Sequence, residues 1–305
     1  MSRLLALLAA VVLALVLGAC GGDDTDMPQR VAPSDGPPIR IGAKNFTEQL
    51  ILGELYSQAL KAKGFDVVLK ANVGSTEIIH RALRRGALDM YPEYVGVLLS
   101  EVADDLSRPS SPAAAYEVAK EFEEENGFTL LAQTPFADSN ALAVMPRFAE
   151  RSAVRTIADL GRLKGPLRIG ALPEFRTRFE GLKGLKQVYG LDNLRVTAMS
   201  AEQRYPALDN GRVEVASVFT TEAQLAGSKY VVLDDPHGLF ASGHVAPIVS
   251  EKILEAHGPR LSAAIDAVSQ RLTTAAMREM NAAVDLNGRM PADVAAEFLR
   301  RHKLG

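Results

Sequence analysis

The sequence predicts an α/β protein in which two lobes enclose a ligand cleft. In residues 39–99, a short apolar run three times precedes a polar cluster that begins a helix, at Lys44–Glu48, Gly74–Thr76 and Tyr91–Tyr94. Residues 159–235 repeat this alternation of strands and helices. Such alternation is typical of a mainly parallel sheet with right-handed crossovers. In an open α/β sheet the strand-to-helix junctions lie together beyond the strand ends, where ligands bind.

The helix starts of the first segment follow from local chemistry. Asn45 is in position to cap a helix, and Glu48 stands three residues later, which is the spacing of a capping box. Ser75 is the expected cap of the second helix, so its hydroxyl and that of Thr76 should face the cleft. Pro92 fits the first turn of a third helix, because proline is tolerated where the backbone N–H has no helical partner.

The folded part is too long for one compact core. It begins near residue 39 and runs to the end, about 265 residues, which suits two lobes. We expect residues 39–137 to form the first part of lobe 1 and residues 138–235 to form lobe 2. Residues 236–305 then return to lobe 1 and are mostly helical. Two lobes joined by two crossings are typical of a hinged protein that closes on a ligand.

The N-terminus predicts export and a lipid anchor. Leu4–Leu17 is a 14-residue run without charged or polar side chains, too short to span a bilayer and typical of a signal peptide over residues 1–19. Leu17-Gly18-Ala19-Cys20 resembles a bacterial lipobox, in which Cys20 is lipidated. Residues 20–38 have almost no large apolar side chains and should be a flexible tether. The alternative is a simple signal peptide followed by a buried structural cysteine.

Composition and motifs argue against several other classes. The formal charge of −3 argues against nucleic acid as a partner. The five histidines are scattered without metal-ligand spacing, so no metal and no cofactor is expected. The chain has no Gly-x-Ser-x-Gly elbow, no Walker lysine loop and no His-Glu-x-x-His motif. We therefore expect no enzyme activity. Glu93 in particular is expected to favour a helix N-terminus rather than to act as a base.

Four segments carry a family resemblance: residues 41–60 (IGAKNFTEQLILGELYSQAL), 86–96 (GALDMYPEYVG), 174–191 (EFRTRFEGLKGLKQVYGL) and 280–299 (MNAAVDLNGRMPADVAAEFL). They resemble the substrate-binding proteins of glycine betaine/carnitine/choline ABC transporters over residues 39–304. The resemblance implies a type II periplasmic-binding-protein fold. It also implies an extracytoplasmic protein at the cell membrane that delivers a small zwitterionic, carboxylate-bearing solute to a permease and its ATPase.

The resemblance also implies roles for individual residues. By position, Lys44 and Arg178 match the family's carboxylate-binding lysine and arginine. A desolvated carboxylate needs such charge-assisted donors. Tyr94 matches one ring of the tyrosine cage around the quaternary ammonium, and Phe219 stands where another ring is expected.

The chain departs from the family pattern at one position on the carboxylate side of the site and at several on the aromatic side. Val97 replaces a carboxylate-binding threonine, Asn140 replaces a cage tyrosine, and Gly243 or His244 occupies the place of another. Each ring facing a desolvated cation is worth about 0.5–2 kcal/mol, so this loss is large. Asn140 offers an amide donor and acceptor instead. The candidates to replace the missing rings are Phe46, Tyr91, Phe175, Tyr205 and His244.

Two alternatives to an importer component remain open at this point. A sensor domain that presents its ligand to a membrane partner without transport would have the same sequence features. An extracytoplasmic enzyme on the same two-lobe fold is the other alternative, although no catalytic motif supports it. The sequence leaves the identity of the solute open, because the tyrosine cage is incomplete.

Overall fold

The computed structural model describes residues 36–107, 109, 111–240 and 243–305. The predicted signal peptide, Cys20 and the tether up to residue 35 lie outside the described residues. Within the described part, no helix is both long and apolar enough to cross a membrane.

The first of two five-stranded sheets combines strands from both ends of the folded chain. Its strand order is β2-β1-β3-β10-β4. β1 pairs in parallel with β2 and β3, whereas β10 runs antiparallel to β3 and β4. The strands are β1 (Ile39–Gly42), β2 (Val67–Lys70), β3 (Met90–Tyr94), β4 (Phe128–Leu130) and β10 (Val245–Ser250).

The second sheet uses only the middle of the chain. Its order is β7-β6-β8-β5-β9, with β6 parallel to β7 and β8, and β5 antiparallel to β8 and β9. The strands are β5 (Asn140–Val144), β6 (Leu167–Ala171), β7 (Leu194–Ala198), β8 (Val215–Phe219) and β9 (Val231–Val232). The predicted α/β class with two lobes is confirmed, each sheet forming the centre of one lobe.

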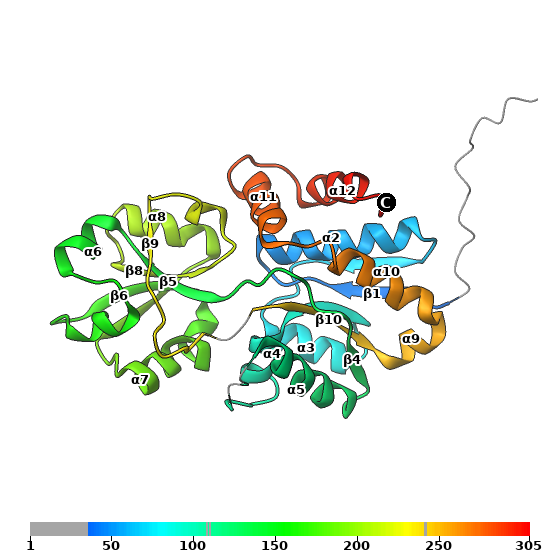
Figure 1. Ribbon diagram of the computed structural model, residues 1–305, viewed down its shortest axis with the longest axis horizontal. Helices are drawn as coiled ribbons and strands as arrows, with labels where there is room; N and C mark the ends of the chain where they lie inside the picture. The colour runs from blue at the N-terminus through cyan, green and yellow to red at the C-terminus, as the bar shows by residue number, and fades with distance from the viewer. Residues whose placement is uncertain (1–35, 108, 110, 241–242) are drawn as a thin grey trace, which may run out of the picture. The chain divides into compact units, whose positions relative to one another are not determined.

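Helices cover both faces of the first sheet (Figure 1). One core lies between the sheet and α2, α10, α11 and α12, and its buried residues include Ile51, Ile265 and Phe298. A second core lies between the other face and α3, α4 and α5. The helices of this lobe are α2 (Thr47–Ala62), α3 (Thr76–Arg84), α4 (Val95–Glu101), α5 (Pro112–Glu124), α9 (Glu251–His257), α10 (Pro259–Ser269), α11 (Thr274–Asp285) and α12 (Pro291–Arg301).

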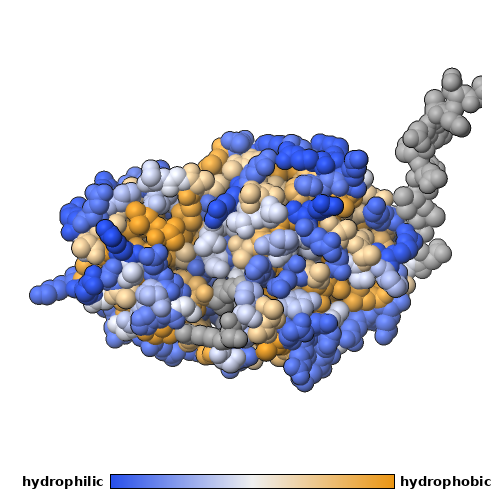
Figure 2. All heavy atoms as spheres, viewed as in Figure 1, coloured by the Kyte–Doolittle hydropathy of each residue, from blue (hydrophilic) through white to orange (hydrophobic). Residues whose placement is uncertain are grey.

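The second lobe has shorter helices and also buries apolar residues on both faces of its sheet. Its helices are α6 (Pro146–Ser152), α7 (Gly184–Tyr189) and α8 (Arg204–Asp209), with the short turns η1 (Ile157–Arg162), η2 (Pro173–Arg176), η3 (Phe179–Lys183), η4 (Ala201–Gln203) and η5 (Ala223–Leu225). The surface in Figure 2 is largely hydrophilic, with small separate apolar groups. This agrees with cores that take up most large apolar side chains.

Two segments connect the lobes, after β4 and before β10. They touch where Ala137 and His244 form an antiparallel bridge, and the N–H of Asp138 donates to the carbonyl of Gly243 over 2.9 Å. A Cβ on Gly243 would lie 1.4 Å from the carbonyl oxygen of Asp138. The close approach of the two segments therefore requires glycine at 243, and no ring is possible there.

Two local predictions about the first segment are wrong. Asn45 does not cap α2, because Phe46 occupies the N-cap position and makes no side-chain cap. Pro92 does not begin a helix but lies within β3, opposite Pro247 of β10. The strand β10 pairs with β3 along the whole of Met90–Tyr94 and keeps this segment extended, so α4 starts only at Val95. Sequence-distant pairing thus overrides the local helix signal.

Candidate functional site

Lys44 lies at the junction of β1 and α2 and is buried, with 3% of its surface exposed. Its Nζ donates to Oε1 of Glu93 over 2.5 Å and to the hydroxyl of Thr76 over 3.1 Å, and lies 4.6 Å from the centre of the Tyr94 ring. Burial lowers the pKa of Lys44, and the charge of Glu93 opposes that effect. The structure thus brings three predicted residues, Lys44, Thr76 and Tyr94, into one buried cluster.

Phe46 connects the rings of the two lobes. Its ring stacks on Tyr94 with centroids 6.2 Å apart and on Phe219 with centroids 5.4 Å apart. Phe219 ends β8 of the second lobe, whereas Tyr94 ends β3 of the first. The predicted pair of rings is therefore joined by a third, Phe46, which the sequence identified only as one of several candidates.

The Tyr94 hydroxyl donates to the buried carboxylate of Glu48 over 2.8 Å. The same carboxylate accepts hydrogen bonds from the Thr221 hydroxyl at 2.5 Å and from Nδ2 of Asn281 at 2.9 Å. Because Thr221 belongs to the second lobe, Glu48 bridges the lobes. Burial raises the pKa of Glu48, although its three donors oppose the shift.

Arg178 lies between η2 and η3 and reaches Glu77 of α3 across the lobe interface. Its Nε and Nη2 donate to the two carboxylate oxygens of Glu77 over 3.0 and 3.1 Å. The Ser75 hydroxyl donates to the same carboxylate. Burial alone would raise the pKa of Glu77, but the hydrogen bonds and charge of Arg178 outweigh it and lower the pKa to about 2. Arg178 and Ser75 thus hold a carboxylate at the interface between the lobes.

The structure places Asn140 beside Phe219, because the two residues are partners in the register of β5 and β8. Nδ2 of Asn140 donates to Oε2 of Glu180 over 2.7 Å. His244 lies apart from this group, since its Nδ1 is 2.9 Å from the carbonyl oxygen of Thr134 on the other connecting segment. Its backbone carbonyl accepts from the N–H of Val95, so its observed hydrogen bonds join elements near the connection.

The remaining candidate rings have other surroundings. Tyr91 is fully buried against His80, with 3.1 Å between its hydroxyl and Nδ1 of His80. Phe175 belongs to the core of the second lobe. Tyr205 donates to Glu222 over 2.5 Å and lines a cavity of about 320 Å³ that adjoins Phe46 and Phe219.

Sequence reasoning missed the carboxylates that pair with the predicted residues: Glu93 with Lys44, Glu77 with Arg178 and Glu180 with Asn140. Glu93 was expected at a helix N-terminus, but it lies in β3 and binds the Lys44 ammonium. The sequence feature that could have identified Glu93 as a site residue was its position within the Tyr-Pro-Glu-Tyr motif. Within the ranges that the structure describes, no cluster of three or more potential metal ligands occurs.

These features define the class of protein: two α/β lobes with charged and aromatic side chains from both lobes meeting at the interface. A family described as the substrate binding domain of ABC-type glycine betaine transport systems matches residues 37–301. The chain belongs to this family.

Relatives and solved structures agree with that assignment. The chain is 34% identical to the glycine-betaine-binding protein of Pseudomonas aeruginosa, over 87% of this chain and 88% of that protein. It is 26% identical to the glycine betaine-binding protein YehZ of Escherichia coli, over 87% and 90%. A crystal structure titled glycine betaine/carnitine/choline ABC transporter matches with a TM-score of 0.69 and 25% identity, over 87% of this chain and 99% of that one.

The chain is accordingly a substrate-binding protein of an ABC importer rather than an enzyme. Proteins of this class act outside the cytoplasm, where they bind a small solute and work with a permease and an ATPase.

Proposed function

We propose that this protein captures a small zwitterion with a carboxylate, glycine betaine or a polar relative, by closing its two lobes. The solute carboxylate binds Arg178 and Lys44, with Ser75 and Thr76 as hydroxyl donors. The cationic end faces Tyr94 and Phe219, and Asn140 contacts a polar group of the solute. We propose lobe boundaries at 137/138 and 235/236, a lipid anchor at Cys20 and a tether up to residue 38.

One observation carries this proposal: Arg178 and Ser75 already hold a carboxylate, that of Glu77, at the interface between the lobes. The planar guanidinium donates through two nitrogens, which is the geometry that favours carboxylates. A solute carboxylate competes with Glu77 for Arg178, so binding exchanges one charge pair for another. This exchange keeps the buried cation compensated in both states.

The cationic end of the solute requires rings and negative charge. Tyr94, Phe46 and Phe219 supply three stacked rings from both lobes. The cage is poorer in tyrosines than the family pattern, and carboxylates such as Glu48 and Glu180 lie next to the predicted contacts. In their ionised forms these carboxylates favour a cationic group at this end of the solute.

Isothermal titration with glycine betaine, choline, carnitine, proline betaine and ergothioneine tests the proposal. Ergothioneine is included because a Helicobacter pylori relative, 26% identical over 87% of this chain, is named an ergothioneine transport permease/binding protein. We expect at least one carboxylate-bearing ligand to bind and choline, which lacks a carboxylate, to bind more weakly. The absence of heat from all five, with a cooperatively folded protein, would refute a betaine-like solute.

A sensing role is the second candidate. A Halobacterium salinarum relative, 27% identical over 87% of this chain and 84% of that protein, is named a chemotactic signal transduction system substrate-binding protein. The same solute site serves transport or signalling, depending on the membrane partner. Uptake of labelled solute by cells with and without the gene separates the two, because a pure sensor leaves uptake unchanged.

A further inference from the structure

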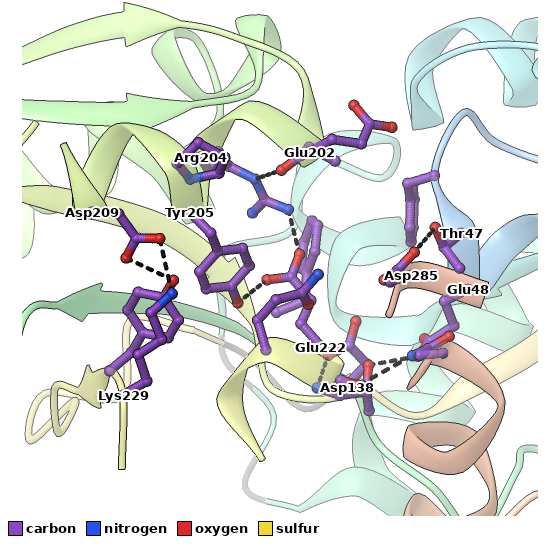
Figure 3. A pocket seen from close by; sticks show the side chains of 18 residues that line it. Thr47, Glu48, Asp138, Glu202, Arg204, Tyr205, Asp209, Glu222, Lys229 and Asp285 are labelled. Carbon is purple, nitrogen blue, oxygen red and sulfur yellow. Dashed lines mark hydrogen bonds and ion pairs between the residues drawn. The ribbon is translucent and has the colours of Figure 1, made fainter. Parts of the chain in front are cut away.

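A cavity of about 320 Å³ lies beside the proposed solute site and is lined by both lobes (Figure 3). It adjoins the Phe46–Phe219 stack, and Glu48 belongs to both the cavity wall and the bridge to Tyr94. Lys44 and Arg178 do not line it. The cavity is at the small end of the size range of ligand pockets. The residues that line the cavity therefore differ from those that are proposed to bind the solute carboxylate.

The wall carries six carboxyl groups and two cations. Its two cations, Arg204 and Lys229, are already paired with Glu222 and Asp209. The carboxylates on the wall are Glu48, Asp138, Glu202, Asp209, Glu222 and Asp285. Burial, together with the charge of Glu48, raises the pKa of Asp138 well above its usual range. Burial is the main cause of the shift, so the protonated form of this carboxyl is favoured until a cation lies beside it.

Aromatic rings line the same space. Phe46 and Phe219 form one side, and Tyr205 and Tyr230, whose centroids are 4.8 Å apart, form another. The faces of aromatic rings attract cations, especially where water is excluded. Rings and surplus carboxylates together favour an organic cation over an inorganic ion, which needs oxygen ligands on several sides.

Two buried acceptor atoms on the wall lack a donor among the described residues, Oε1 of Gln224 and Oδ1 of Asn281, and Asn281 is the more buried of the two residues. Asn281 is 3% exposed, and its Nδ2 donates to Oε2 of Glu48 and to the carbonyl oxygen of Thr221. These two acceptors fix the orientation of the amide. Its Oδ1 is buried and has no hydrogen-bond partner among the described residues. A buried acceptor without a donor costs free energy, and an N–H group of a ligand would remove that cost.

From these observations we infer that the cavity is a second binding site for an organic cation with N–H donors, a primary ammonium or a guanidinium group. A quaternary ammonium carries positive charge but has no N–H, so it does not satisfy Asn281. The site shares Phe46, Phe219 and Glu48 with the proposed cationic end of the betaine-like site, but it also contains Asn281 and carboxyl groups of the second lobe. Because Glu48 and Asp285 come from the first lobe and Glu202 and Glu222 from the second, a cation here holds the lobes together.

Agmatine, which has a primary ammonium and a guanidinium, is a direct probe, and tetramethylammonium is the matching cation without N–H groups. Titration calorimetry of the protein should show binding of agmatine and at least about tenfold weaker binding of tetramethylammonium. The double variant Glu202→Gln/Asp285→Asn removes one rim carboxylate from each lobe. This double variant should bind agmatine at least about tenfold more weakly than the unmodified protein.

The matched control is Glu150→Gln/Asp293→Asn, which removes one exposed carboxylate from each lobe outside the cavity. It should bind agmatine like the unmodified protein. The inference is overturned if agmatine does not bind the folded protein, if both double variants bind it equally, or if tetramethylammonium binds equally well. Thermal unfolding of each variant shows that the fold is retained.

A second readout is the proton balance. A bound cation stabilises the ionised forms of Glu48 and Asp138, so binding should release protons and strengthen as the pH rises. Calorimetry in buffers of different ionisation enthalpy measures this release, and proton uptake would contradict the inference. Titration of the same variants with glycine betaine reports on the other site. Failure of the betaine-like assignment and failure of the cation site are thus separate results.

Discussion

Two ion pairs at the cleft differ in burial and in connectivity. Lys44–Glu93 lies entirely in the first lobe, with side chains 4% and 1% exposed. Arg178–Glu77 joins the lobes, with side chains 15% and 33% exposed. The first pair exists whether the cleft is open or closed, whereas the second exists only when the lobes meet. The first pair therefore persists when the lobes separate, whereas opening breaks the second, whose arginine then becomes available to a ligand carboxylate.

The largest effect is expected from breaking the buried pair. Glu93→Ala leaves the Lys44 ammonium buried without a counter-charge, and should reduce the free energy of unfolding by about 3–5 kcal/mol. Urea denaturation of the variant and the unmodified protein measures this. The double variant Lys44→Met/Glu93→Leu should recover much of the loss, because no charge is left buried. A loss below about 1 kcal/mol for Glu93→Ala would show that water reaches Lys44.

The next effect concerns the interior behind the same pair. Glu123 is fully buried, and burial raises its pKa to about 7, while burial lowers the pKa of neighbouring His80 to about 4. The folded state binds the Glu123 proton more tightly than the unfolded state. Its contribution to stability is complete below about pH 4.5 and is lost as the pH rises through 7.

Glu123→Gln removes this titration, whereas His80 titrates in both proteins. From pH 5 to pH 8 the unmodified protein should lose up to about 3 kcal/mol of unfolding free energy relative to the variant. Denaturant titrations of both proteins at the two pH values measure the difference. If the difference in unfolding free energy between the two proteins is the same at pH 5 and pH 8, the Glu123 carboxyl is hydrated and its pKa is not raised.

A smaller effect is expected at the pair that joins the lobes. Arg178→Gln should lower the affinity for a carboxylate-bearing solute at least about tenfold, which is about 1.4 kcal/mol of binding free energy. The thermal unfolding temperature should change little. Arg176→Gln is the matched control, since Arg176 is exposed and donates to the carbonyl of Val196. Calorimetry with the best ligand compares the three proteins. Equal affinity in all of them would place the carboxylate elsewhere.

The smallest effect on stability is expected for Glu77→Gln. The pKa of Glu77, about 2, lies below its value in the unfolded chain. The contribution of this carboxylate to the free energy of unfolding is therefore present above about pH 4.5 and is lost as the pH falls towards 2. Because Glu77 is one-third exposed, we expect less than about 1 kcal/mol at pH 7. Denaturation at pH 7 and pH 3 tests this, and a variant as destabilised at pH 3 as at pH 7 would contradict it.

Much of the fold was predictable, because apolar periodicity and helix signals are local. The alternation of strands and helices predicted two α/β lobes. Ser75 occupies the predicted N-cap position of α3, but its hydroxyl donates to Glu77 and makes no capping hydrogen bond with the backbone. Pro92 was misplaced because β10, more than 150 residues later, pairs along the whole of β3. No local pattern contains that information.

The sequence by itself determined the family, the two-lobe class and the candidate binding residues Lys44, Arg178 and Tyr94. These could be recognised because a motif of consecutive residues can be read without knowing which strands pair. Only the tertiary structure decided their partners. Glu93, Glu77 and Glu180 are ordinary carboxylates in the sequence, and folding brings them within hydrogen-bond distance of the predicted donors. The physical reason is that a buried charge requires a counter-charge, and sequence spacing does not show which carboxylate supplies it.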